Sequence, residues 1–591
     1  MPMNRAPKFA KRLLIAAIVA ASGLSLADTD GFTATNSELD GRLFYQILSG
    51  EIANRQGDNG LAFRFISAAA KSSDDESLSA RAVEIAIQAG SGDAAWGAVN
   101  DWIKRQPDSQ KAQAMKLRVS IATGRMNGIT DALSRILAQS TAEERRELIR
   151  AIPGTLNRLP NVLQKKADDI AQASLKSVKQ DRLFAAAAWA AIGFVRVNNQ
   201  DMQGALRALG EAYRWDAADL DAGRLALTLL EQGVAEAEPL VLKHIAALPI
   251  KTNARFSYAR LLFIDNRQTP ALEQIERIHQ DEPTFIPAWL LQGQIALQQG
   301  DLQLAETAAT KALTLNQSAA TAGTAGSQAE QARSDLIERQ SRLLLADVAQ
   351  ARGDWTGVEQ RLSLIPADDD VNYRRAIALG KQGRTEEALR LLEPAEATAQ
   401  DEAADSRKNS MNMKVRWLRE FDRTADAYEL SAEMMSAFPD DIDVMYGHAM
   451  LAEQLKRHDE MERLLRAVIA KKPDYAHAYN ALGYAWVDRG VRLTEAQALI
   501  EEALKRSPND PLITDSLGWA YYRQGQLTLA ARTLQKAYSL KQDPEIAAHL
   551  GEVWWKLGQT ESAEKLLRDA VARYPSNSVL KDTIKRLGLA L

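Results

Sequence analysis

The dipeptide Leu-Gly recurs in the last third of the chain, and its spacing constrains the fold more than any other feature. Three of its copies lie at residues 482–483, 517–518 and 550–551, at separations of 35 and 33 residues. An aromatic side chain follows each of these glycines by three positions, and a second glycine follows by seven. A unit of this length cannot bury an apolar face alone, so successive units must stack on one another. The sequence therefore predicts a chain of stacked repeats.

Each repeated position has a role in a pair of antiparallel helices. Leu482 and Trp486 lie four residues apart, on one face of a first helix. Gly483 lets a neighbouring helix approach the backbone, and Gly490 ends the first helix. Small alanines keep the second helix close to its partner, and a proline closes the unit because it cannot continue a helix. The remaining marker residues are Tyr521, Trp554, Gly525, Gly558, Ala496, Ala503, Ala530, Ala537, Ala563, Ala570, Pro508, Pro544 and Pro575.

This pattern resembles the tetratricopeptide repeat (TPR), a helix pair of about 34 residues. The resemblance implies an all-α fold, a TPR superhelical solenoid of antiparallel helix pairs. Ala and Leu dominate the composition, which favours helix. Weaker copies of the register continue upstream, for example at Gly293 and Gly300 and at Gly50 and Gly57. Residues 110–285 keep helical periodicity but lose these markers, so we expect degenerate helix pairs there; an ordinary helical bundle is the alternative.

The composition of one segment predicts two arrays. Residues 316–330 (NQSAATAGTAGSQAE) are small and polar, which predicts a flexible insertion over residues 316–336. It would join N-terminal helical, TPR-like repeats at 28–315 to a C-terminal TPR array at 337–591. A terminal repeat needs a polar outer face, so residues 576–590 are expected to form a capping helix.

The first 27 residues have the layout of a secretory signal peptide. Arg5, Lys8, Lys11 and Arg12 precede an apolar run, and small residues stand just before residue 28. An uncleaved membrane anchor is the alternative. The apolar stretch is about 15 residues long, short against the roughly 20 that span a bilayer. No later stretch reaches that length, so we expect an exported protein with no membrane span.

Charge and cysteine content narrow the function classes further. The chain carries a net charge of −4, and removal of the signal peptide takes away four positive charges and no negative ones, which leaves −8. An acidic chain argues against nucleic-acid binding, which needs Lys and Arg for the phosphates. The chain has no cysteine, which excludes disulfides, thiol catalysis and a lipid anchor on a cysteine. These features fit the bacterial periplasm.

No familiar catalytic motif is present. The sequence lacks GxSxG, GxxxxGKS/T and GxGxxG, and its histidines form no HExxH pair. Acidic pairs such as Asp440 and Asp441 stand beside turn signals and fit helix caps. We therefore predict no catalytic residue, no metal site and no cofactor. The histidines, read as structural or surface residues, are His244, His279, His448, His458, His477 and His549.

The concave face of the first helices is the expected binding surface, because TPR arrays resemble one another in binding ligands there. Carried onto the three clear units, this face presents amide, charged and aromatic side chains. The candidate partner-binding residues are His477, Asn480, Tyr484, Asp488, Asp515, Trp519, Tyr522, Arg523, Glu545, Glu552, Trp555 and Lys556.

Trp519 and Trp555 stand out in this set. Leu517 and Tyr521 already fill the packing positions of their helix, as Leu550 and Trp554 do in the next, so the two tryptophans are expected to be exposed. Trp, Tyr and Arg dominate the energetics of protein interfaces. The alternative is that these aromatic side chains pack against neighbouring repeats.

Two segments extend the resemblance to one bacterial group. Residues 43–90 (beginning LFYQILSGEIANRQGDNG) and 480–559 (beginning NALGYAWVDRG) resemble the long periplasmic TPR proteins of proteobacteria. That group includes the LbcA-type adaptor of a carboxyl-terminal processing protease. The resemblance implies an adaptor that binds this protease and presents its substrates, cell-wall hydrolases, while carrying no chemistry of its own.

The chain departs from the lipoprotein members of this group at one point. They have a cysteine at the mature N-terminus, whereas this chain reads SLADTD there. Acylation is therefore not available, and the protein would be free in the periplasm or held by a partner. The alternative functions are an envelope assembly scaffold, for polysaccharide secretion or outer-membrane biogenesis, and an enzyme of a new type. The sequence predicts no oligomeric state.

Overall fold

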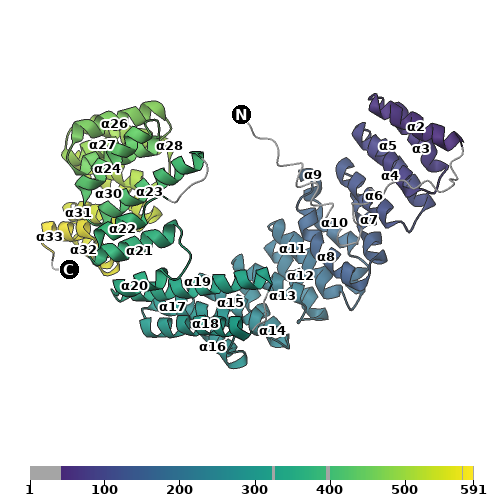
Figure 1. The fold of residues 1–591 in the computed structure, drawn as a ribbon, viewed down its shortest axis with the longest axis horizontal. Helices are drawn as coiled ribbons and strands as arrows, with labels where there is room; N and C mark the ends of the chain where they lie inside the picture. Colours follow the sequence, from purple (N-terminus) through teal and green to yellow (C-terminus); the bar gives the residue numbers. More distant parts are fainter. Residues whose placement is uncertain (1–40, 323–326, 395–399, 576, 590–591) are drawn as a thin grey trace. The chain divides into compact units, whose positions relative to one another are not determined.

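The fold is known from a computed structural model that describes residues 41–322, 327–394, 400–575 and 577–589. Every regular element in these residues is a helix. The chain divides into two compact units, Met1–Ile337 and Glu338–Leu591, hereafter unit 1 and unit 2 (Figure 1). The division falls one residue after the predicted start of the second array. The predicted signal peptide lies outside the described residues.

Unit 1 contains a run of helices and two short 3-10 turns. Its α-helices are α2 (Gly41–Arg55), α3 (Asn59–Lys71), α4 (Glu76–Gln88), α5 (Gly92–Arg105), α6 (Gln110–Thr123), α7 (Met126–Gln139), α8 (Ala142–Leu156), α9 (Asn161–Gln164), α10 (Ala167–Ser174), α11 (Ala185–Asn198), α12 (Met202–Trp215), α13 (Leu220–Glu231), α14 (Glu238–Ala247), α15 (Thr252–Ile264), α16 (Gln268–Asp281), α17 (Ile286–Gln299) and α18 (Leu302–Ala322). The 3-10 turns are η1 (Val178–Gln180) and η2 (Ala235–Ala237).

Unit 2 is a regular succession of helix pairs, and α19 (Gln328–Ala351) runs across its first residue. Its further helices are α20 (Trp355–Leu362), α21 (Asp369–Lys381), α22 (Thr385–Leu391), α23 (Gln400–Glu420), α24 (Thr424–Ala437), α25 (Ile442–Gln454), α26 (His458–Lys471), α27 (Ala476–Arg489), α28 (Leu493–Arg506), α29 (Pro511–Arg523), α30 (Leu527–Leu540), α31 (Pro544–Lys556), α32 (Thr560–Arg573) and α33 (Ser578–Leu587).

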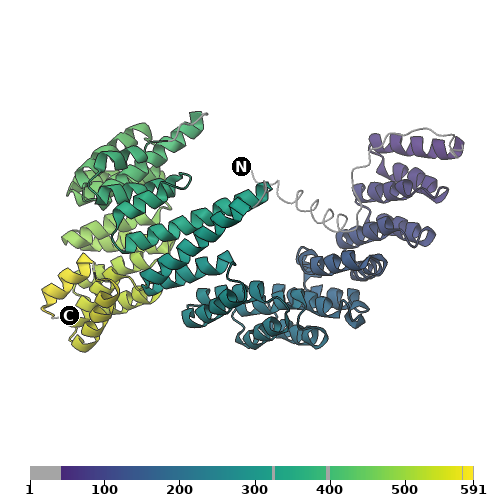
Figure 2. The ribbon, with the colours of Figure 1, turned by 60° about the horizontal axis from the view of Figure 1, so that its bottom comes forward.

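Consecutive helices pack in pairs, as the repeat pattern predicts, and the pairs stack within each unit (Figure 2). In the α27–α28 pair, a Cβ added to Gly483 would lie 2.8 Å from the backbone oxygen of Ala496. This close approach explains the glycine. Gly490 ends α27 in the left-handed region, with φ of 71°. Trp486 is buried, and its Nε1 donates to Glu462 Oε1 of the preceding pair at 2.7 Å.

The weak-marker region 110–285 contains both regular pairs and an irregular stretch. Pairs form at α6–α7, α11–α12 and α15–α16. Between α8 and α11, however, the chain forms the short helices α9 and α10, and α8 packs on α11. Pro160, which lacks a backbone N–H, stands at the start of α9 as its N-cap residue. One helix pair of the solenoid is therefore replaced by shorter elements.

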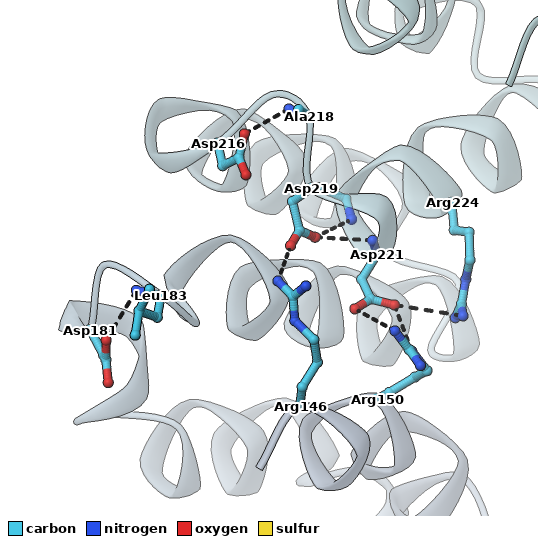
Figure 3. A network of polar contacts seen from close by, with 10 residues as sticks. Arg146, Arg150, Asp181, Leu183, Asp216, Ala218, Asp219, Asp221 and Arg224 are labelled. Atoms are coloured by element: carbon cyan, nitrogen blue, oxygen red, sulfur yellow. Dashed lines mark hydrogen bonds and ion pairs between the residues drawn. The ribbon is translucent and has the colours of Figure 1, made fainter. Parts of the chain in front are cut away.

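Ion pairs between buried aspartates and partly exposed arginines join α8 to α13 across this irregular stretch (Figure 3). One carboxylate oxygen of Asp219 caps α13 by accepting the backbone N–H groups of Asp221 and Ala222, each at 3.0 Å. The other oxygen accepts Arg146 Nη2 at 2.6 Å. Asp221 Oδ1 accepts Arg150 Nε at 2.9 Å. Residues 73 and 71 positions apart in the sequence thus hold the two helices together.

The prediction of a flexible insertion over residues 316–336 is wrong for most of that segment. Helix α18 continues to Ala322, and α19 begins at Gln328. Asn316 Nδ2 donates to the backbone oxygen of Ser334 at 2.9 Å, which ties the two helices together. Alanine has the highest helix propensity, and extending an existing helix needs no new nucleus, so this alanine-rich stretch is helical. Residues 323–326 lie outside the described residues.

A terminal helix covers the last repeat. Helix α33 packs on α31 and α32 through Leu580, Thr583 and Ile584, which are buried. Its other side exposes charged side chains, among them Lys581 and Lys585. The helix is shorter than the predicted span 576–590, because Gly588 ends it with φ of 69°. A polar outer face of this kind is what the end of a solenoid requires.

Candidate functional site

The twelve candidate residues all lie on the first helices α27, α29 and α31 of unit 2. Neighbouring members of this series contact one another, so the structure brings the three sets together. We call this surface the inner-face site. Its residues differ in exposure: His477, Asp488, Glu545 and Lys556 are exposed, Asn480, Tyr484, Tyr522, Arg523 and Trp555 are half-buried, and Asp515, Trp519 and Glu552 are buried.

The expectation that Trp519 is exposed is wrong. Its side chain is only 8% exposed. The indole stacks on the ring of Tyr522, with centroids 4.6 Å apart, and on the imidazole of His549, with centroids 4.2 Å apart. Trp519 therefore packs against the neighbouring repeat, which was the alternative to exposure, because its ring fills space between α29 and α31. Trp555 remains half-buried.

A buried ion pair lies beneath this stack. His549 Nδ1 lies 2.9 Å and 3.1 Å from the two carboxylate oxygens of Asp515. Burial alone would lower the pKa of His549, but the charges of Asp515, Glu545 and Glu552 outweigh it and raise the pKa above its ordinary value. The carboxylate of Asp515 thus stabilises the protonated form of His549.

A second polar contact connects the site to the capping helix. Tyr522 donates its hydroxyl to Glu552 Oε1 at 2.8 Å, and Arg586 of α33 pairs with the other oxygen of Glu552. Burial, followed by the hydrogen bond to this carboxylate, raises the pKa of Tyr522 to about 12. The phenol therefore stays protonated at neutral pH, and its hydrogen bond to Glu552 holds the Tyr522 ring against Trp519.

Two buried polar atoms of the inner-face site have no hydrogen-bond partner. They are the indole Nε1 of Trp519, a donor, and the Oδ1 of Asn480, an acceptor. Leaving such groups unpaired costs about 1–3 kcal/mol each. A peptide group supplies both an acceptor and a donor, so an extended segment of a partner has the chemistry that these atoms lack.

Sequence reasoning missed two residues of the site. His549 was read as a structural or surface residue, yet it directly precedes the Leu550-Gly551 marker, and that register places it on the first helix beside Asp515. No sequence pattern pointed to Arg586, because the capping helix does not follow the repeat. Both residues form ion pairs with carboxylates of the site, His549 with Asp515 and Arg586 with Glu552.

A serine, a histidine and a glutamate also converge in unit 2. Ser431 Oγ lies 2.5 Å from His448 Nδ1, and His448 Nε2 lies 3.6 Å from Glu460. Ser431 is buried, and its hydroxyl donates to the backbone oxygen of Tyr428 at 2.9 Å. Since a hydroxyl has one proton, it cannot also give that proton to His448. Burial lowers the pKa of His448, so the ring is neutral and serves packing.

Within residues 41–589, apart from the gaps named above, no group of three or more His, Cys, Asp or Glu side chains has the geometry to hold a metal ion. Among the helices described, none combines the length and apolar character needed to cross a membrane.

Comparison with known proteins supports the repeat assignment. Residues 446–511 and 516–578 match the Tetratricopeptide repeat family, and residues 286–318 match a second description of the same repeat. A TPR repeat-containing protein of Pseudomonas aeruginosa is 35% identical over 241 residues. That match covers 41% of this chain and 40% of the relative, so the two proteins align over less than half of their lengths.

Solved structures also resemble parts of this chain. One is a thermophilic TPR protein of Thermus thermophilus, with 20% identity, a TM-score of 0.29, and coverage of 30% of this chain and 98% of that one. Another is MamA of Desulfovibrio magneticus, with 16% identity, a TM-score of 0.25, and coverage of 29% and 97%. Residues 286–318, 446–511 and 516–578 are thus tetratricopeptide repeats, and the described residues have an all-α fold of stacked helix pairs, a fold typical of protein–protein interaction scaffolds.

Proposed function

We propose that the protein is a non-catalytic adaptor and that its inner-face site binds a protein partner. The observation that carries this proposal is the pair of unpartnered buried atoms, Trp519 Nε1 and Asn480 Oδ1, on neighbouring first helices. Among the twelve residues of the site, all of them described, no other buried side-chain nitrogen or oxygen lacks a partner. Because both atoms are enclosed, a bound peptide segment would complete these two hydrogen bonds if the Trp519 and Asn480 side chains turned toward it.

The surroundings of these atoms suit a partner surface. The stack of Trp519 on His549 is held by Asp515, and Glu552 holds Tyr522, so the aromatic groups are fixed before any partner arrives. Rigid aromatic side chains lose little entropy on binding. Exposed charges border the stack and would set the orientation of a partner, and reversing one of them would place like charges together at a cost of several kcal/mol.

The partner we propose is a periplasmic carboxyl-terminal processing protease, whose substrates the adaptor would present. The support is the resemblance of residues 43–90 and 480–559 to long periplasmic TPR proteins, together with the basic and apolar opening of the chain. The division into two units favours the same role, because one chain could hold a protease and a substrate and raise their effective concentration.

Affinity capture from a periplasmic extract tests this function, with the bound proteins identified by mass spectrometry. Two matched variants make it specific: Glu545→Lys reverses an exposed charge on the first helix α31, and Glu561→Lys does so on the second helix α32. We expect the first variant to lose a processing protease and cell-wall hydrolases and the second to retain them. Capture of secretion or outer-membrane assembly components alone would replace the adaptor by an envelope scaffold. Equal capture by both variants would refute the inner-face site.

A further inference from the structure

Helix α2, the first described helix of unit 1 (Figure 1), has an apolar outer face. Phe44, Tyr45, Leu48 and Ile52 are 55%, 62%, 47% and 47% exposed. With 3.6 residues per turn, these four positions fall within an arc of about 100° on the helix surface. They therefore form one continuous stripe, which we call the α2 stripe.

The α2 stripe contrasts with the other end of the chain. A terminal repeat needs a polar outer face, because no further repeat stacks on it. Helix α33 has such a face, with Lys581 and Lys585 exposed, whereas α2 exposes aromatic and aliphatic side chains. In the described part of the chain α2 packs mainly on α3, and no other helix precedes it. Helix α2 thus has the surface of an inner helix at an end position.

The size of the α2 stripe suits a weak protein contact. Taking about 200 Å² for each whole side chain, its four residues together expose about 400 Å². Apolar patches of roughly 300–600 Å² are the largest on a typical monomer and are often functional. Two copies paired through the stripe would cover about 800 Å² of apolar surface before any polar rim is added, which is the size of a weak, reversible complex.

The pattern of the stripe favours a second copy of the chain as its occupant. Its main residues lie at positions 44, 48 and 52, so the stripe is symmetric about its centre and complements itself when one helix is reversed. The chain's own preceding segment, residues 28–40 (DTDGFTATNSELD), has four acidic side chains and only two large apolar ones. That composition offers little to cover four exposed apolar side chains.

We propose that the α2 stripe binds α2 of a second copy of this chain, with the two helices antiparallel about a twofold axis at Leu48. Leu48 then meets Leu48 of the other copy, and Phe44 meets Ile52. Arg55, at the end of the stripe, lies opposite Gly41, whereas a parallel pair would place the two Arg55 charges together. This arrangement is the twofold dimer, the commonest symmetric assembly. The inference does not rest on the proposed function, because the stripe belongs to unit 1 and the inner-face site to unit 2.

Sedimentation equilibrium of the purified full-length protein tests the pairing. We expect a reversible dimer with a Kd of about 10–100 µM, weaker than that of larger interfaces. Leu48→Glu places two carboxylates at the centre of the interface and should weaken the dimer about tenfold or more. Leu242→Glu, at a leucine of α14 that is 43% exposed, is the matched control and should leave the dimer unchanged. A parent that stays monomeric at about 200 µM, or a dimer that Leu48→Glu does not weaken, would overturn the proposal.

Single cysteines test the register, because the chain has no cysteine of its own. A disulfide needs Cα atoms about 4.4–6.8 Å apart, so only closely opposed positions form one. Under mild oxidation Leu48→Cys should give a disulfide-linked dimer, and Leu242→Cys should not. Phe44→Cys mixed with Ile52→Cys should cross-link more than either variant alone. Preferential pairing of Phe44→Cys with itself would show a parallel pair and overturn the proposal.

The Leu48→Cys variant also identifies the occupant if the protein is monomeric. A thiol shielded from maleimide would show that the chain's own N-terminal residues cover the α2 stripe. A reactive thiol would show that the stripe is free for a different protein. Either result in a monomeric protein overturns the pairing of two copies.

Discussion

Replacing Asp219 separates the two interactions through which it holds unit 1 together. Asp219→Ala removes the cap of α13, worth about 1 kcal/mol. It also removes the charged hydrogen bond to Arg146, which is worth about 1–2 kcal/mol. We favour the lower end of this range, because the Arg146 side chain is 39% exposed and can bond to water once Asp219 is gone. The expected loss of local stability is about 2–3 kcal/mol. Asp219→Asn keeps the cap, since Asn caps helices as well as Asp, and should lose only about 1 kcal/mol.

Hydrogen exchange of the α13 amides, followed by mass spectrometry on the full chain, measures these losses locally. A loss of about 1.4 kcal/mol accelerates exchange about tenfold, so Asp219→Ala should accelerate it roughly 30- to 150-fold and Asp219→Asn about fivefold. Asp216→Asn is the control, because Asp216 accepts only a backbone N–H of its own loop, from Ala218. Equal acceleration by Asp219→Ala and Asp219→Asn would show that the cap contributes nothing and would refute the reasoning.

Three further perturbations have defined outcomes. The pKa of His549 in the folded protein is raised above its unfolded value near 6.5. The contribution of His549 to the free energy of unfolding is therefore complete below about pH 6.5 and is lost as the pH rises through the folded pKa. The urea midpoint of the parent should fall over this pH range, and that of His549→Gln should not. Gly483→Ala should destabilise by about 1–3 kcal/mol because its methyl would lie 2.7 Å from a side-chain carbon of α28, while Gly447→Ala, in open space, should stabilise by about 0.5–1 kcal/mol in the same denaturation assay. Arg586→Gln leaves the buried carboxylate of Glu552 without its cation, so limited proteolysis should release α33 faster than in the parent; an unchanged rate would show that the pair does not hold the cap.

The sequence predicted the parts of the fold that follow from local spacing. The Leu-Gly register implies a close helix approach at Gly483 and a helix end at Gly490, and the structure has both. The same register placed all candidate site residues on three neighbouring helices. A periodic sequence allows such inferences because each repeat contacts mainly its neighbours.

Features that depend on non-local contacts could not be predicted in this way. Trp519 does not occupy one of the repeat positions that normally pack in the core, such as those of Leu517 and Tyr521. It is nevertheless buried, because His549, 30 residues later, stacks on it. Arg146 and Asp219 come from helices that carry no marker residues. The error at residues 316–336 has another cause: small residues were read as flexible, although alanine extends an adjoining helix readily.

The ion pairs between α8 and α13 have a consequence for the order in which the chain folds. In most of the solenoid a repeat can complete its contacts as soon as the next one forms, so folding can nucleate at many points and spread. The Arg146–Asp219 pair closes a loop of 73 residues, which raises the local contact order. We therefore expect the segment from α8 to α13 to fold more cooperatively, and more slowly, than a repeat that contacts only its neighbours.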